Sequence, residues 1–284
     1  MLVAGSFIVS EKLSGITNPF SLTLLRFVGA SILLLPFVIY KRKWRSKIIS
    51  TFPRALIISF FYSGYFIGLF ESLNTTSSLN TSTLFTLVPL ITALLSIVVF
   101  GNKLKSIDIS VYILGMIGTI WVIFKGQLNI LFSFSVNEGD LIFLIAVVFM
   151  GLYSIAMKYL YRNDDIIVLV FCTLVGGSFW MITAMTFMGQ PLQWDLIQGD
   201  SIYYMIYLII GATLGTAYFY QIATVALGPS RVSAYIYLNP ALVAVLLLFV
   251  DVTSMNKSIL PGIVISIIAT FVLQYHRKSS IKVP

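Results

Sequence analysis

The chain has 284 residues, of which 58% are apolar and only 10% are charged, whereas a soluble domain is roughly half apolar and about a quarter charged. This composition excludes an ordinary soluble domain and predicts a protein that crosses a membrane many times, because each helical crossing needs about 20 mostly apolar residues. The net charge of +8 does not indicate nucleic-acid binding, since the basic residues separate long apolar runs, where they orient a protein in the bilayer.

Ten apolar stretches lie between short polar segments and predict an all-α polytopic membrane protein with ten transmembrane helices. We expect these helices over residues 2–15, 19–40, 52–73, 78–100, 107–124, 139–161, 166–188, 202–226, 229–250 and 259–275. The first stretch is short for a crossing and contains Glu11 and Lys12. We interpret it as a true span and not as a signal peptide, since it lacks a basic segment before it and a cleavage site leading into a soluble domain.

The residues that usually hold metals and cofactors are scarce in this sequence. Cys172 is the single cysteine and His276 the single histidine, which excludes a disulfide framework, a cysteine-based zinc site and a histidine pair for haem or zinc. No glycine-rich turn with a following lysine indicates a phosphate site, so nucleotide hydrolysis has no support. We therefore expect no cofactor, no metal and no enzymatic activity.

Most of the 18 basic residues fall in alternate loops. If the N-terminus is cytoplasmic, the inner side receives the run KRKWRSK over residues 41–47, together with Arg54, Arg231 and the C-terminal tail. The opposite side receives few, such as Lys125. Because basic loop residues are enriched on the cytoplasmic side of a membrane, this distribution predicts that both termini are cytoplasmic.

An internal repeat becomes visible when Pro89 is aligned with Pro240. The same alignment places Gly64 on Gly215. It also pairs Ser82 with Ser233, Leu87 with Leu238, Ala93 with Ala244, Leu95 with Leu246 and Val99 with Val250. We interpret the pattern as two five-helix repeats, residues 1–126 and 137–278. An odd number of spans inverts the second copy in the membrane, as in many secondary transporters.

Five segments of the sequence together resemble a known family. They are GSFIVSEKL, NPFSLTLLRFVGASILLLP, SLNTSTLFTLVPLITALLS, GDLIFLIAVVFMGLYSIAMKYL and ALGPSRVSAYIYLNPALVAVLL. Their order, spacing and duplication are similar to those of the EamA family of the drug/metabolite transporter superfamily, over essentially the whole chain. The chain differs from the family pattern in lacking the few residues usually found before GSF. It also has Glu71 where an apolar or small residue is more common.

This resemblance implies a ten-helix carrier of the cell inner membrane with both termini in the cytoplasm. It implies movement of small metabolites such as amino acids, usually outward. It also implies a central cavity lined mainly by the first, third, fourth, sixth, eighth and ninth helices.

Charged side chains within the spans are costly in hydrocarbon, so each is a functional hypothesis. Arg26 lies inside the second span and Glu71 near the end of the third, both toward the predicted outer side. In one alternative they form an ion pair that acts as a fixed outer gate. In the other, Glu71 takes up and releases a proton during transport. We favour the gate, and a purely structural pair or separate interfacial side chains also fit the sequence.

The candidate central site combines aromatic rings, hydroxyls and amides on helices that border the repeat axis. Such rings offer apolar area, hydroxyl donors and attraction for an ammonium group, and prolines within helices free backbone carbonyls that can face a water-filled cavity. The candidate substrate-binding residues are Tyr65, Ser82, Thr86, Tyr153, Tyr218, Gln221, Tyr235 and Asn239, and the candidate gating or coupling residues are Arg26, Glu71, Pro89 and Pro240. Ordinary packing of the rings and simple kinks at the prolines are the competing interpretations.

These observations favour a secondary transporter that exports a small metabolite, such as an amino acid or a similar amphipathic compound, by alternating access of two inverted repeats. An uncoupled facilitator is the alternative, and a membrane sensor without transport fits less well because the loops are short. The expected partners are a small-molecule substrate and the lipid bilayer. Protons as coupling ions, and a monomeric or homodimeric state, stay open.

Overall fold

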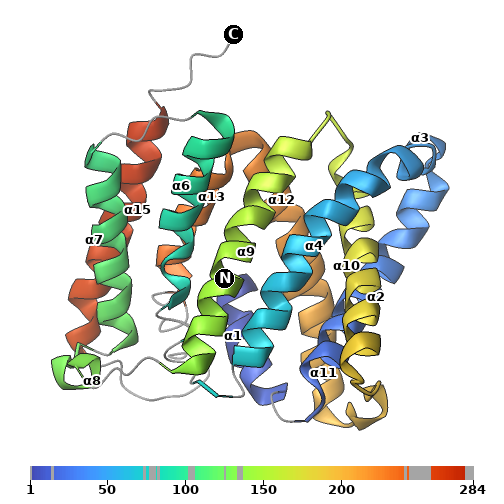
Figure 1. Cartoon of the computed structure of the whole chain (residues 1–284), viewed down its shortest axis with the longest axis horizontal. Coiled ribbons are helices and arrows are strands. Elements are labelled where there is room, and N and C mark those ends of the chain that lie inside the picture. The colour runs from blue at the N-terminus through green and yellow to red at the C-terminus, as the bar shows by residue number, and fades with distance from the viewer. Residues whose placement is uncertain are drawn as a thin grey trace.

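The computed structural model of the chain describes residues 2–13, 16–72, 75–76, 81, 84–101, 106–124, 126–132, 137–239, 242 and 257–278. Every regular element in these ranges is a helix (Figure 1). The elements are α1 (Leu2–Leu13), α2 (Pro19–Tyr40), α3 (Arg42–Arg45), α4 (Ile48–Ser72), α6 (Val88–Phe100), α7 (Ser106–Ile123), α8 (Leu128–Phe132), α9 (Glu138–Leu160), α10 (Ile166–Met188), η1 (Trp194–Leu196), α11 (Asp200–Tyr207), η2 (Leu208–Gly215), α12 (Thr216–Leu227), α13 (Pro229–Ala234), η3 (Tyr235–Leu238), η4 (Lys257–Ile259) and α15 (Leu260–Lys278).

Six helical segments in the described ranges are long and apolar enough to cross a membrane. They are Pro19–Tyr40, Ile48–Leu69, Ser106–Ile123, Glu138–Leu160, Ile166–Met188 and Asp200–Leu227. The all-helical class is thus confirmed. The remaining four predicted spans correspond to α1, α6, α13 with the residues after it, and α15, whose apolar parts are shorter where they are described. The total of ten spans therefore stays a prediction.

Local sequence signals explain where several helices begin and end. The Asn18 side chain accepts a hydrogen bond of 2.8 Å from the Phe20 amide, and Pro19 occupies the first turn of α2, the position that tolerates proline best. Asn137 and Asp140 form a reciprocal capping box at the start of α9, with bonds of 2.9 and 3.0 Å. At the end of α10, Gly189 adopts a φ of 63°, which side chains other than glycine rarely adopt.

Two segments differ from the sequence-based expectation. The basic run at residues 41–47 was expected as a loop and contains the short helix α3. The span expected over residues 202–226 is helical from Asp200 to Leu227, but its middle, η2, is a π-helix. The wider π turn lies where α1 and α2 pack against this segment. A Cβ on Gly29 of α2 would lie only 2.7 Å from Ile209, so the glycine permits that close approach.

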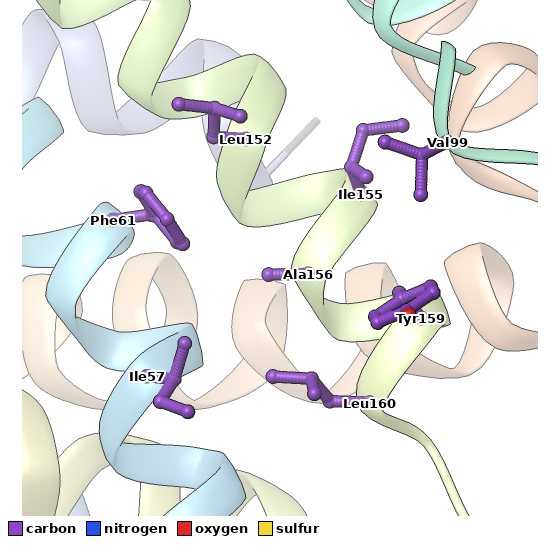
Figure 2. A pocket seen from close by; sticks show the side chains of 8 residues that line it. All are labelled: Ile57, Phe61, Val99, Leu152, Ile155, Ala156, Tyr159 and Leu160. Atoms are coloured by element: carbon purple, nitrogen blue, oxygen red, sulfur yellow. The ribbon is translucent and has the colours of Figure 1, made fainter. Parts of the chain in front are cut away.

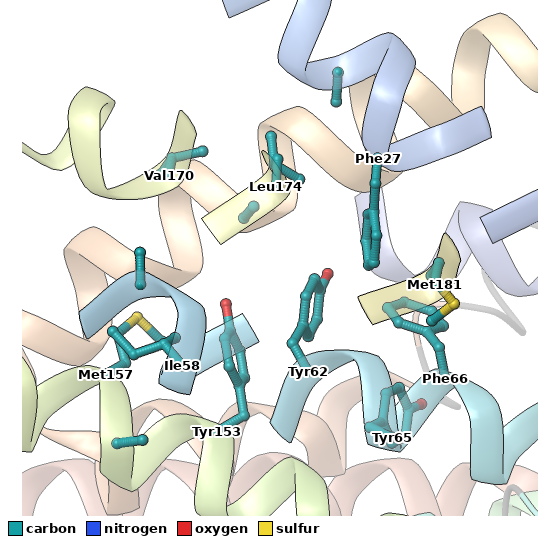
Figure 3. Close-up of a cluster of buried hydrophobic side chains, with 14 of the residues drawn as sticks. Phe27, Ile58, Tyr62, Tyr65, Phe66, Tyr153, Met157, Val170, Leu174 and Met181 are labelled. Carbon is teal, nitrogen blue, oxygen red and sulfur yellow. The ribbon is translucent and has the colours of Figure 1, made fainter. Parts of the chain in front are cut away.

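The long helices form a bundle in which neighbours in space are often distant in sequence (Figure 1). In this view α7 and α15 lie together at one side, and α2 and α10 lie at the other. Between them, α4 packs against α9 and α10, and α6 packs against α9 and α13. The η2 segment packs against α1 and α2. The largest apolar core, part of which is drawn in Figure 3, lies among α2, α4, α9 and α10.

The two ends of the bundle differ in composition. At the "α3 end" lie α3, the segment that joins α9 to α10 and, on the other side of the bundle, the end of α15 (Figure 1). At the opposite "α11 end" lie α8 and α11. The helix α1 occupies only the part of the bundle near the α11 end, in accord with its 12 residues. At 1.5 Å per residue this helix covers about 18 Å, which is less than the hydrocarbon thickness.

The contact between α7 and α15 depends on a pair of glycines. A Cβ added to Gly262 would lie 2.6 Å from the backbone oxygen of Gly118, and a Cβ added to Gly118 would lie 2.9 Å from the backbone nitrogen of Ser266. These are backbone atoms, which cannot move aside as a flexible side chain can. Small residues of this kind let helices approach closely where water supplies no driving force for association.

We predict that Gly262→Ala lowers the melting temperature of the detergent-solubilised protein, because the added methyl group forces α15 away from α7 at a cost of about 1–3 kcal/mol. Gly211→Ala is the matched control, since a Cβ there meets Tyr207 and Leu2 at ordinary distances of 3.4 and 3.5 Å. An unchanged melting temperature for Gly262→Ala would contradict the close contact of these two helices.

Candidate functional site

Four aromatic rings stack in a row where α2, α4, α9 and α12 meet, and we call them the central stack: Phe27, Tyr62, Tyr153 and Tyr220. Successive ring centroids lie 5.5, 4.5 and 5.9 Å apart, with interplanar angles of 27°, 21° and 13°. Figure 3 shows Tyr62 and Tyr153 side by side, with their hydroxyls pointing in the same direction. Phe27, Tyr62 and Tyr153 are buried and Tyr220 is half-buried, so most of the row fills the interior of the bundle.

Polar groups border the Tyr153 and Tyr220 part of the stack. The hydroxyls of Tyr220 and Ser154 lie 2.7 Å apart. The fully buried Gln221 donates to Thr173 Oγ1 over 3.3 Å, and its amide also interacts with Tyr153. Its carbonyl oxygen, Oε1, has no hydrogen-bond partner among the described residues. A buried acceptor without a donor is costly, so this part of the bundle has hydrogen-bonding capacity that its own side chains do not use.

Arg26 lies beside the other part of the stack, one residue before Phe27. Its side chain is 5% exposed. Its Nε donates to Thr213 Oγ1 in η2 over 3.0 Å, and its Cζ lies 5.2 Å from the centroid of the Phe66 ring. Tyr62 and Tyr65 are close enough to interact electrostatically with it. Within the part of the chain that the structure describes, no carboxylate lies within 4.0 Å of this guanidinium.

The expected Arg26–Glu71 ion pair is therefore not formed in this structure. Glu71 instead lines a polar pocket of about 290 Å³ near the α11 end, with Asn18, Pro19, Phe20, Gln190, Pro191 and Gln193. Asn18 donates from its side chain to Gln190 and from its backbone to Gln193 Oε1, the latter over 2.7 Å. These bonds connect the start of α2 to the segment after α10. The pocket offers Glu71 neutral amides rather than the guanidinium.

The structure brings some of the predicted site residues together. Tyr65 and Tyr153 are buried in the same core as Tyr62, Tyr218 packs against that core, and Gln221 adjoins Tyr153. Thr86 is buried and precedes α6. Tyr235, by contrast, is 46% exposed, and Asn239 is half-buried. Ser82 and Pro240 lie outside the described residues.

Pro89 occupies a different position from the one expected. It was expected near the middle of a continuous helix, where it would free a backbone carbonyl. In the structure α6 begins at Val88, so Pro89 lies in its first turn. A proline at this position breaks no helical hydrogen bond, since the first amides of a helix have no acceptor within it.

Three members of the central stack were not among the predicted site residues: Phe27, Tyr62 and Tyr220. A signal was present for Tyr62, because Tyr62, Tyr65 and Phe66 are three and four residues apart and share a face of one helix. Tyr220 directly precedes Gln221, yet residues adjacent in a helix point in different directions. The sequence alone did not show that both would reach the interior. Thr213, the partner of Arg26, carried no such signal.

A charged cluster connects α4 to the segment between α9 and α10 at the α3 end. Arg54 makes two contacts of 2.8 Å with the Asp164 carboxylate and also donates to the Leu160 carbonyl over 3.1 Å. Lys47 lies 2.8 Å from Asp165. The hydrogen bond from Lys47 holds the pKa of the Asp165 carboxyl below its usual value. The Lys47–Asp165 contact is therefore present at neutral pH and is lost only when the pH falls through that lowered pKa.

A separate groove of about 480 Å³ lies between α4, α6 and α9 (Figure 2). It is lined by Ile57, Phe61, Val99, Leu152, Ile155, Ala156, Tyr159 and Leu160. All but one of these side chains are hydrocarbon. The groove suits an apolar chain and has almost nothing to orient a polar compound, so we do not assign the functional site to it.

Long apolar helices surrounding buried tyrosines, an arginine and a glutamine define a multi-pass membrane protein with a polar interior. The same arrangement of helices occurs in a solved structure titled "Crystal structure of protein". The two share 16% sequence identity and a TM-score of 0.75, over 98% of this chain and 94% of that one. At this identity the similarity establishes the fold alone.

The model of the EamA-like transporter family matches residues 1–124 and again residues 137–275. The chain therefore belongs to the EamA-like transporter family. It is also similar to a protein of Bacillus subtilis (strain 168) described as "Uncharacterized transporter YyaM", with 23% identity over 197 residues. That match covers 68% of this chain and 64% of the relative, so a third of the relative has no counterpart in the alignment.

We predict that Arg54→Gln and Asp164→Asn each lower the free energy of unfolding by about 2–4 kcal/mol, because each leaves a mostly buried charge without its partner. The double variant should lose less than the sum of the two. Lys43→Gln is the control, since Lys43 lies 3.9 Å from Asp165 with 74% of its side chain exposed, and such surface pairs contribute about 0–1 kcal/mol. Strict additivity in detergent-induced unfolding would show that Arg54 and Asp164 do not interact.

Proposed function

We propose that the protein is a secondary transporter that exports a small amphipathic metabolite, such as an amino acid, by alternating access between two inverted five-helix halves. The observation that carries this proposal is the central stack with its adjoining Gln221. The stack combines rings from α2 and α4 with rings from α9 and α12, so a compound bound there would contact both halves of the chain. Membership of a transporter family supports the same conclusion.

The packing of the helices supports the inverted repeat. If residues 1–126 and 137–278 are equivalent, α2 corresponds to α10, α6 to α13 and α7 to α15. A two-fold axis in the membrane plane brings a helix that lies next to the axis against its own equivalent, and these three pairs are in contact. The same axis makes the contacts of α4 equivalent to those of η2. The helix α4 packs against α9 and α10, and its equivalent, η2, packs against α1 and α2.

Both ends of the bundle carry contacts between the two proposed halves. At the α3 end Arg54 bonds to Asp164. At the α11 end Asn18 bonds to Gln190, and Thr76 donates to Asp140. The two proposed halves are thus in contact at both ends of the bundle, and the rings of the central stack fill the space between these ends. Opening toward one side therefore requires one set of contacts to break while the other stays, which is the movement that alternating access needs.

We propose that the α3 end, at which α15 ends, faces the cytoplasm, and that both termini lie on that side of the inner membrane. The supporting observation is that Lys43, Lys47, Arg54 and Arg162 are all near that end, since basic residues near span ends favour the cytoplasm. Reporter fusions after Lys47 and after Gln193 are predicted to report opposite sides, cytoplasmic for the first. If both fusions report the same side, the orientation and the inverted repeat are both wrong.

Transport itself is tested with purified protein in liposomes loaded with an unlabelled amino acid, by following entry of the labelled compound. We predict that Tyr62→Leu lowers the initial rate of this exchange at least about tenfold, which corresponds to about 1.4 kcal/mol at the barrier. Tyr203→Leu, at an exposed position of α11, is the matched control and should exchange at the wild-type rate. Equal rates for the two variants would remove the central stack from the pathway, and no exchange of any amino acid by wild type would contradict the proposed substrate.

The same liposomes separate a coupled carrier from an uncoupled facilitator. A carrier driven by protons accumulates substrate when a pH gradient is imposed, whereas a facilitator only equilibrates it. We propose that Glu71 is not the proton carrier. Amide side chains line its pocket, which favours a role in closing the α11 end of the bundle. Glu71→Gln should therefore leave gradient-driven accumulation unchanged. Lost accumulation with retained exchange would assign the proton to Glu71.

A further inference from the structure

Arg26 is a cation with no carboxylate of the described residues within 4.0 Å of it. An arginine stays protonated in a protein, and an unpaired charge within a membrane costs at least several kcal/mol. Its neighbours here are Thr213 and Phe66, with Tyr62 and Tyr65 close by. A hydroxyl and the face of an aromatic ring reduce that cost, but neither carries a negative charge.

Three buried or partly buried acids of the described residues have other partners. Asp164 is held by Arg54 and Asp165 by Lys47 at the α3 end, and Asp140 caps α9 and accepts from Thr76. Glu71 lies in the pocket at the α11 end, beyond 4.0 Å from Arg26. In this structure none of them neutralises Arg26. The missing negative charge is therefore one that a bound compound can supply.

The geometry leaves the guanidinium ready for such a compound. Only Nε is used, in the bond to Thr213, so the two terminal nitrogens donate no hydrogen bond to any described residue. These two nitrogens form the planar fork that matches the two oxygens of a carboxylate. Thr213 lies in the π-helical segment η2, and such π turns within helices are frequent at functional sites.

We propose that Arg26 binds the carboxylate of the transported compound, so that the substrate is a monocarboxylate or a zwitterion and not an organic cation. The proposal rests on the proposed transport function and names the chemical class of its substrate. One positive charge balances a carboxylate, whereas a phosphate dianion would leave negative charge unbalanced among the rings. The rings of Phe66, Tyr62 and Tyr65 then contact the rest of the compound, and they attract an ammonium group without requiring one.

The first experiment uses the wild-type protein in detergent and compares each L-amino acid and 2-hydroxy acid with its own methyl ester. Binding is measured as the rise in melting temperature with ligand concentration. At least one acid is expected to stabilise the protein, with an apparent affinity at least tenfold above that of its ester. Esters that stabilise as well as acids, stabilisation by inorganic phosphate alone, or no stabilisation by any acid would each overturn the proposal.

The second experiment repeats the titration of the best acid on variants. Arg26→Gln should abolish the preference for acid over ester. Arg26→Lys should retain part of it, because a lysine keeps the charge without the fork, and Thr213→Val should weaken acid binding several-fold by releasing Nε. Arg45→Gln, at an exposed position of α3, should bind as wild type. An unchanged preference in Arg26→Gln would overturn the proposal, and if that variant does not fold, unchanged acid binding by Thr213→Val and Arg26→Lys together would do so.

The two proposals fail in different ways. Acids that bind through Arg26 but do not exchange across liposome membranes would contradict transport and leave the carboxylate site standing. Exchange that proceeds equally with acids and esters, and equally in wild type and Arg26→Gln, would uphold transport and remove the carboxylate site.

Discussion

Tyr62 and Tyr153 stack with centroids 4.5 Å apart where α4 packs against α9, and the other groups of the interior are arranged around that pair. Phe27 extends the row on one side and leads directly to Arg26, while Tyr220 extends it on the other and leads to Gln221. Because stacked rings fix distance and orientation together, a shift of α4 against α9 displaces both polar ends of the row. The cation and the amide of the interior thus adjoin the two ends of one row of aromatic contacts.

The sequence was sufficient to predict where helices lie along the chain, but not which face of each helix points into the protein. Apolar runs predicted α10 to the residue, and Asn18 with Pro19 marks the start of α2. In a helix that is apolar all round, however, periodicity does not show which side faces protein and which faces lipid. That is why Tyr62 and Tyr220 were missed, whereas Tyr235, which is 46% exposed, was included. The π turn of η2 and the start of α6 at Val88 depend on packing between helices, which local sequence does not record.

The charges inside and at the ends of the bundle have different roles. At the α3 end each described acid of the 161–165 segment is matched by a basic residue of α3, α4 or the turn between them, so those charges contribute to holding the helices together. Arg26 is buried with no carboxylate of the described residues within 4.0 Å, and its retention there costs stability that the rings only partly offset. A group kept in the membrane at such a cost is better explained by binding than by folding.

The two ends of the bundle are closed by chemically different bonds. The α3 end is held by ion pairs, which salt screens and which acid neutralises. The α11 end is held largely by uncharged amides, those of Asn18, Gln190 and Gln193, whose hydrogen bonds depend little on either. In the orientation proposed above, the contacts that meet the variable surroundings of the cell are the ones insensitive to acidity and salinity. The sensitive contacts then face the cytoplasm, whose composition the cell itself regulates.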